Sequence, residues 1–237
     1  MNCKNCNQEV NANFCANCGQ PASIKRINGD YIVQEIGQVL NFEKGIFYTI
    51  RELLFRPGEN VKKFITEDRS RLIKPILFII VSSLIYSIIN NFFKIEDSYL
   101  NYGGLEASSV GKIFKWVQEN YGYANIIMGV FIALWIKLFF RKYDYNFYEI
   151  LILLCFVMGM GMLIFALFAF LQGVTKFDLM GFAGILGFAY ITWAVGQFFD
   201  KNKPLNYIKA LFSYFFGAIS SMILAIAIGI AIDMILK

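Results

Sequence analysis

The chain contains no histidine, and charged residues make up only 16% of its 237 positions. Histidine is the side chain that most often exchanges protons near neutral pH, so its absence removes the commonest general acid and base. The sequence also offers no nucleophile paired with a base, no paired carboxylates within a hydrophobic segment and no glycine-rich phosphate loop. We therefore expect no enzymatic activity.

Charge is scarcest after residue 72, where long hydrophobic stretches begin. Hydrophobic residues make up 57% of the chain, against about 45–50% in soluble domains. The stretch from Pro75 to Phe93 holds no charge and is long enough to cross a ~30 Å hydrocarbon core as a helix. The N-terminus lacks the apolar core of a signal peptide, so we expect no cleavable leader. Five spans are predicted, at residues 73–93, 124–140, 150–172, 179–199 and 207–236.

The polar N-terminal segment contains two Cys-x-x-Cys pairs separated by eight residues, which are Cys3 with Cys6 and Cys15 with Cys18. Two tight turns of this kind can bring four thiolates to a tetrahedral Zn²⁺ site. Gly19 follows the second pair, where such a turn often needs a positive φ. Two disulfides or a redox dithiol are the alternative, although a redox motif would need a thioredoxin-like βαβ context that the sequence lacks. The pattern predicts a zinc ribbon over residues 1–23, with Zn²⁺ as its cofactor.

A zinc ribbon this short cannot bury a hydrophobic core, so the metal would do the folding. Four cysteine ligands leave no open coordination position for catalysis, which favours a structural role. Lys4, Lys25 and Arg26 are the basic residues nearby. They make a thin patch for the phosphate contacts that dominate nucleic-acid affinity, and we expect no nucleic-acid partner.

Residues 24–72 are predicted to form amphipathic helices, at about 31–40, 46–54 and 59–68, with a turn at Arg56-Pro57-Gly58. Helices this short need a partner for their apolar faces. They can pack on each other or lie on the bilayer surface, and we favour the bilayer. A basic cluster precedes the first span and is predicted either to contact anionic headgroups or only to fix topology: Lys62, Lys63, Arg69, Arg71 and Lys74.

The distribution of lysine and arginine predicts an orientation. With the N-terminus inside, 17 of the 22 basic residues fall on the inner side and five on the outer side, as the positive-inside rule requires. The N-terminus is therefore predicted to be cytoplasmic and the C-terminus outside. A reducing compartment for the cysteines also disfavours disulfides. The spans carry no ionisable residue clearly at mid-depth, which disfavours a proton- or ion-coupled transporter.

Small residues recur at every fourth position of the fifth predicted span, at Gly217, Ser221, Ala225 and Gly229. Such a stripe lets helix backbones approach closely, either within one chain or between copies in a homo-oligomer. Asp233 continues the stripe, and it is predicted to pair with Lys176, to pair with a helix end or to face water. We therefore treat Asp233 as a candidate functional residue.

Several short runs resemble a family of uncharacterised bacterial membrane proteins that is catalogued as a domain of unknown function. The similar residues are Cys15-Ala16-Asn17-Cys18-Gly19-Gln20, Lys25-Arg26-Ile27, residues 48–54, Arg56-Pro57-Gly58, Arg69 and Pro75. The resemblance implies a zinc ribbon before a hydrophobic half, in a bacterial cytoplasmic (inner) membrane, and it implies no activity. Some members carry histidines near the third span, which this chain lacks. The five-span layout is also similar to that of Yip1-type membrane-trafficking proteins.

The sequence as a whole predicts an all-α integral membrane protein. Its parts are a zinc ribbon at 1–23, cytoplasmic amphipathic helices at 24–72 and a five-span bundle at 73–237. We expect a multi-pass scaffold or adaptor that resides in the lipid bilayer, with a head that engages a cytoplasmic protein or the membrane surface. A small-solute or ion transporter is the alternative.

Overall fold

The computed structural model of the protein describes residues 2–3, 5–9, 13–19, 45–95 and 108–235. The chain divides into two compact units, residues 1–40 and residues 41–237. In the described residues, regular structure consists of α-helices and isolated β-bridges, one of which is antiparallel and joins Asn2 to Glu9. The helix expected at 31–40 lies outside these residues. The helices are α2 (Ile46–Phe55), α3 (Pro57–Thr66), α4 (Pro75–Phe93), α5 (Ser109–Glu119), α6 (Tyr121–Phe139), α7 (Phe147–Thr175), α8 (Met180–Asp200) and α9 (Pro204–Ile235).

The five longest helices, α4, α6, α7, α8 and α9, are each long and apolar enough to cross a membrane. They coincide with the five predicted spans, so the predicted all-α class and the number of candidate spans are confirmed. The largest difference at a span end is three residues, because helical hydrogen bonding continues into the flanking polar turns. With 29 residues, α7 extends about 43 Å at ~1.5 Å per residue, which exceeds a ~30 Å hydrocarbon core.

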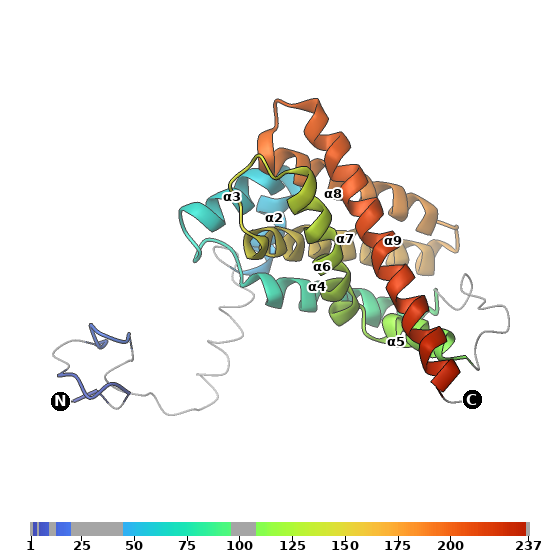
Figure 1. The fold of residues 1–237 in the computed structure, drawn as a ribbon, viewed down its shortest axis with the longest axis horizontal. Helices are drawn as coiled ribbons and strands as arrows, with labels where there is room; N and C mark the ends of the chain where they lie inside the picture. The colour runs from blue at the N-terminus through green and yellow to red at the C-terminus, as the bar shows by residue number, and fades with distance from the viewer. Residues whose placement is uncertain (1, 4, 10–12, 20–44, 96–107, 236–237) are drawn as a thin grey trace. The chain divides into compact units, whose positions relative to one another are not determined.

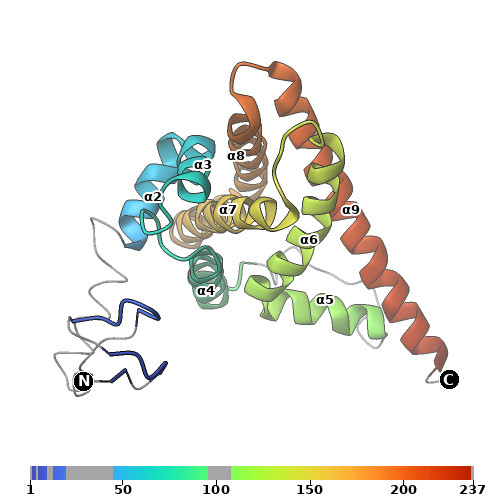
Figure 2. The same cartoon turned by 60° about the vertical axis from the view of Figure 1, so that its left-hand side comes forward.

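Helices α4 and α7 run side by side in the same direction (Figure 1). Near the start of α4, the Phe78 ring lies against Phe156 of α7, with 5.8 Å between ring centroids. At the far end of α4, the Phe93 ring occupies the space that a side chain on Gly173 would need. Helix α8 returns along α7, and α6 and α9 form a second pair that crosses α4 and α7 obliquely (Figure 2).

Helix α9 uses the small-residue stripe for contacts within this chain. A side chain at Gly217 would come within 2.5 Å of the Ile132 backbone in α6, and one at Gly229 within 2.8 Å of the Val110 backbone in α5. Ser221 and Ala225, between these two glycines, are half-buried. The stripe therefore faces α5 and α6.

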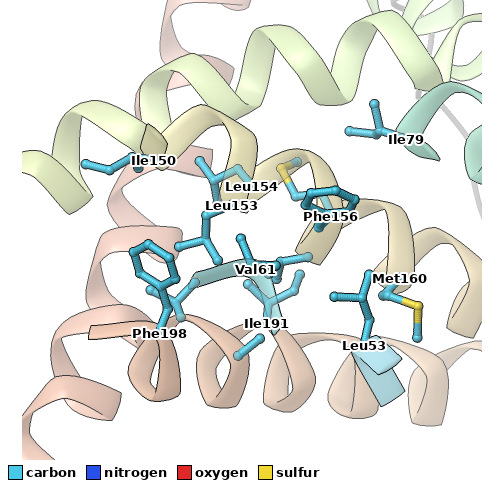
Figure 3. Packing of buried hydrophobic residues seen from close by; sticks show 14 of the residues in the cluster. Leu53, Val61, Ile79, Ile150, Leu153, Leu154, Phe156, Met160, Ile191 and Phe198 are labelled. Carbon is cyan, nitrogen blue, oxygen red and sulfur yellow. The ribbon is translucent and has the colours of Figure 1, made fainter. Parts of the chain in front are cut away.

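The α2–α3 hairpin packs on the bundle, which is a partner for its apolar faces that the sequence did not indicate; whether its exposed surface also lies on the bilayer stays a prediction. Leu53 and Val61 are fully buried, and they share one core with Ile191 of α8 and with residues of α7 (Figure 3). The Phe64 ring meets Phe156 edge-on at 5.2 Å. The reason is that α7 and α8 offer an apolar surface on which these short helices bury the face that they cannot cover alone.

Candidate functional site

The two Cys-x-x-Cys pairs fold into matching turns. The backbone N–H of Asn7 donates to the carbonyl of Cys3, and that of Gly19 donates to the carbonyl of Cys15, each at 2.9 Å. Gly19 has the positive φ that the sequence led us to expect, 72°, and Asn7 occupies the equivalent position with φ 61°. Asparagine tolerates this left-handed region better than most residues, so the first turn closes without glycine.

These turns bring all four thiols together. The sulfur atoms of Cys3, Cys6, Cys15 and Cys18 all lie within 4.8 Å of one another. Two of the Sγ–Sγ distances, for Cys3 with Cys18 and for Cys6 with Cys15, are 3.5 Å. A disulfide requires about 2.05 Å, whereas a tetrahedral ion with ~2.3 Å metal–sulfur bonds has sulfur–sulfur edges of about 3.8 Å. The geometry therefore fits four thiolates around a metal ion.

Backbone amides favour the ionised form of two of these thiols. Hydrogen bonds, first from the backbone of Gln8 and then from the side chains of Cys18 and Asn17, lower the pKa of Cys6 to about 6. Backbone hydrogen bonds from Asn5 and Cys6 lower the pKa of Cys3. A thiolate is the form that binds metal. A metal ion bound by all four sulfurs would have a full tetrahedral shell, which suits a structural centre.

In the unit formed by residues 41–237, polar side chains of α8 bind the ends of the hairpin helices α2 and α3. The Gly58 N–H, in the first turn of α3, donates to Gln197 Oε1 at 2.8 Å. The Tyr190 hydroxyl donates to the Leu53 carbonyl, near the end of α2, at 2.9 Å. Helix ends leave such backbone groups without partners inside the helix. Helix α8 therefore holds the hairpin by hydrogen bonds as well as by its apolar face.

A second polar network closes the hairpin onto the segment before α4. Arg71 donates to Glu52 Oε2 at 2.8 Å and to Asn60 Oδ1 at 3.1 Å, and the Asn60 amide donates to the Glu52 carbonyl at 2.8 Å. The bond to Glu52 raises the pKa of Arg71. The buried Thr49 hydroxyl accepts from the Ile73 N–H at 3.1 Å. The entry to α4 is thereby fixed against both hairpin helices.

Replacing Arg71 by alanine should lower the free energy of unfolding of this unit by about 1–3 kcal/mol. The half-buried Glu52 and the buried Asn60 would lose a charged donor that neither can easily replace with water. The matched control is Arg69→Ala, because Arg69 is exposed two residues away and should change stability by less than about 0.5 kcal/mol. Thermal unfolding of both variants in detergent would measure the difference, and equal midpoints would contradict the role given to Arg71.

The predicted headgroup contacts fall into two groups in the structure. The side chains of Lys62, Lys63, Arg69 and Lys74 are exposed, and their contact with lipid stays a prediction. Arg71 is half-buried and engaged by Glu52 and Asn60, so it belongs to the hairpin network described above. The sequence places all five in one basic cluster because spacing does not distinguish a free cation from one that a fold has paired.

Asp233 lies at a helix end, which is one of the three partners expected for it. Its carboxylate oxygens accept from the Ser109 N–H of α5 at 3.0 and 3.2 Å. Ser108 is the N-cap of the same helix, and its side chain accepts from Gly111. A carboxylate there is stabilised by the helix dipole. In the structure, Asp233 thus joins the end of α9 to the start of α5.

Sequence reasoning missed a set of uncharged polar side chains inside the candidate spans. Ser82, Ser83 and Asn125 are buried, and the Oγ atoms of both serines and the Nδ2 atom of Asn125 have no hydrogen-bond partner within the described part of the chain. The signal was present as a Ser-Ser pair and an asparagine within hydrophobic segments, where each polar group needs a partner.

Residues 43–87 match a family described as "Protein of unknown function (DUF3667)". The match covers α2, α3 and most of α4, and therefore includes the residues of the hairpin network. It does not extend to the cysteine cluster or to α5–α9. No curated protein and no solved structure matches the chain, and the likeness to Yip1-type proteins has no support among these findings.

Proposed function

We propose that the protein is a multi-pass membrane scaffold or adaptor whose head is a zinc ribbon that engages a cytoplasmic protein. The observation that carries this proposal is the closure of four cysteine sulfurs to within 4.8 Å of one another, in a chain whose other unit contains five helices of membrane-spanning length. A closed Cys₄ site suits Zn²⁺ in a structural role. Such a head presents a surface to a partner, and we propose no enzymatic role for it.

Among the described residues of the head, exposed Phe14 best suits a partner. It directly precedes buried Cys15, and 62% of it is exposed to solvent. Aromatic side chains are enriched among the residues that dominate the energy of protein interfaces. The turn formed by Cys15 to Gly19 would hold Phe14 on a rigid base once the metal is bound.

The arrangement of the second unit supports a cytoplasmic N-terminus and a C-terminus outside. Three basic segments gather at one end of that unit: the hairpin, the turn after α6 and the turn after α8. Lys201 pairs with Glu59 of α3 at 2.8 Å, and Lys209 donates to the Phe139 carbonyl at 3.2 Å. One end rich in lysine and arginine is what the positive-inside rule expects of a cytoplasmic face.

The adaptor proposal is tested by crosslinking the full-length protein in native membranes. The variants are Phe14→Ala, which keeps the four thiols, and Cys15→Ser with Cys18→Ser, which removes two of them. We expect a specific crosslinked partner of the wild type to decrease at least about tenfold in both variants, since an anchor residue contributes ~2 kcal/mol or more. Recovery of the same partners from both variants would overturn the proposal. Vesicles of anionic phospholipid without other proteins distinguish the alternative. If the wild-type head binds them, both variants lose this binding and no crosslinked partner is found, the head engages the lipid surface instead.

A further inference from the structure

An open cavity of about 360 Å³ lies between the end of α6 and the start of α9. Three cations line it: Arg141 and Lys142 from the turn after α6, and Lys209 from the second turn of α9. The apolar side chains of Leu138 and Phe139, at the end of α6, complete the lining among the described residues. The cavity thus places concentrated positive charge beside an apolar wall.

The three cations of this cavity form no ion pair with an acidic side chain in the part of the chain that the structure describes. Other lysines at this end of the bundle do. Lys201 pairs with Glu59 at 2.8 Å. Lys203 pairs with Asp200 at 3.0 Å. Like charges that share a cavity repel one another, so an anion that enters it is stabilised by all three. The cavity therefore suits an anionic ligand.

The turn that carries Arg141 and Lys142 is fixed by contacts with the two helices that follow. The ring of Phe140, in this turn, is buried and stacks on Phe199 of α8 with 3.9 Å between ring centroids. The Asn206 amide, in the first turn of α9, donates to the Tyr143 hydroxyl at 2.9 Å. The cavity is therefore formed before any ligand binds, and binding need not order the turn.

Lys209 is positioned by the end of α6. Its Nζ atom donates to the Phe139 carbonyl at 3.2 Å and lies 5.8 Å from the centre of the Phe140 ring. Both contacts stabilise a cation. An ammonium group has three N–H donors, so donors remain for a ligand. Arg141 adds a planar guanidinium that can bind two phosphate oxygens at once. This set of donors suits a phosphate group.

The cavity lies where the uncharged part of each helix ends. Residues 210–232 of α9 carry no charge and extend about 34 Å at ~1.5 Å per residue, close to the thickness of a ~30 Å hydrocarbon core. Lys209 directly precedes this stretch. In α6, residues 121–136 are likewise uncharged. The cations therefore lie at the level of lipid headgroups, and exposed Leu138 lies beside the upper acyl chains.

We propose that this cavity binds the phosphate group of an anionic phospholipid. Lys209 and Arg141 donate to the phosphate oxygens, and Lys142 adds positive charge. The upper part of an acyl chain lies against Leu138 and Phe139. Basic pockets between membrane helices bind anionic headgroups in this way. A free phosphate would use the cations and leave the apolar wall bare, so the combination favours the lipid. The site is separate from the cysteine head and independent of whether the head binds a partner.

The test compares phosphatidylglycerol, which is anionic, with phosphatidylcholine of the same acyl chains, which has no net charge. The full-length protein is purified in mild detergent and mixed with equimolar amounts of the two lipids, and native mass spectrometry measures the fraction that retains each. We expect the wild type to retain phosphatidylglycerol at least about tenfold better, as one charge-assisted hydrogen bond implies. Equal retention would overturn the proposal, a result that does not depend on any variant folding.

Two double variants separate this cavity from diffuse positive charge. Arg141→Gln with Lys142→Gln removes two exposed cations of the cavity and should abolish most of the preference for phosphatidylglycerol. Lys62→Gln with Lys63→Gln is the matched control, because it removes two exposed cations of α3 that do not line the cavity. The control should keep the preference. An equal loss in both would show that charge alone attracts the lipid and would overturn the site.

Inorganic phosphate distinguishes the lipid from a soluble anion. Phosphatidylglycerol should raise the thermal unfolding midpoint of the wild type and not that of the Arg141→Gln, Lys142→Gln variant. Millimolar inorganic phosphate, compared with chloride at equal ionic strength, should leave both midpoints unchanged. A rise with phosphate alone that occurs only in the wild type would assign the cavity to a soluble phosphate and overturn the lipid.

Discussion

Replacing Cys15 and Cys18 together by serine is expected to reduce the zinc content of the purified protein from a single ion per chain to background. The two serine hydroxyls are neutral and bind Zn²⁺ poorly, so only two thiolates of the site would remain. Structural zinc sites have apparent binding free energies of about 10–16 kcal/mol near neutral pH, and loss of half of the ligands removes most of that energy. Elemental analysis of protein purified without added chelator measures the effect.

The chain supplies its own control for this experiment in Cys155. This fifth cysteine is half-buried in α7, and it lies outside the cluster formed by the other four. Cys155→Ser should keep the full zinc content. The head and the helical bundle are separate compact units, so the double serine variant should also keep the thermal unfolding midpoint of the bundle. Zinc retained by the double variant would show that the cluster is not the metal site.

The geometry of the cysteine turns could be predicted in large part from spacing alone. Two residues between the cysteines of each pair restrict the chain to a tight turn, and Gly19 marks the left-handed position that ends the second turn. Asn7 takes that position in the first turn, with φ 61°. The sequence does not mark Asn7 for this role, because asparagine adopts many other conformations, whereas glycine after Cys-x-x-Cys has few competing explanations.

The spans were predictable because hydrophobic length is a property of the sequence itself. The location of the hairpin was not. The spacing of Leu53, Val61 and Phe64 shows that one face must be covered, but the covering residues, such as Ile191 and Phe198, lie more than 120 positions later. Periodicity identifies a buried face and leaves its partner unspecified, so the residues that cover this face had to come from the structure.

The same limit applies to polar residues within the spans. In the sequence, Asn206 and Asn125 are both polar residues near the start of a hydrophobic segment. In the structure, the Asn206 amide donates to the Tyr143 hydroxyl at 2.9 Å, whereas the Asn125 amide has no partner within the described residues. The two differ in what the neighbouring helices place beside them. Only tertiary contacts separate a satisfied amide from one without a partner.

At Gly58, one added methyl group is expected to destabilise the bundle strongly. A Cβ atom there would lie 2.3 Å from the Phe198 N atom, 2.6 Å from the Gln197 carbonyl carbon and 2.8 Å from the Ala194 carbonyl oxygen. All three are backbone atoms of α8, so no side-chain rotation can relieve the overlap. Helix α3 would have to move away from α8, and the hydrogen bond from Gly58 to Gln197 would be lost.

Gly58→Ala is therefore expected to lower the free energy of unfolding by about 3 kcal/mol or more, at the upper end of overpacking effects. For a domain of this size, that corresponds to a fall of about 6–12 °C in the unfolding midpoint. Gly181→Ala is the matched control, because Gly181 lies on α8 with nothing within 4 Å of the added atom. The control should be neutral or slightly stabilising, since alanine favours helix by up to ~1 kcal/mol over glycine. Equal midpoints for the two variants would mean that the hairpin does not pack on α8 as the structure has it.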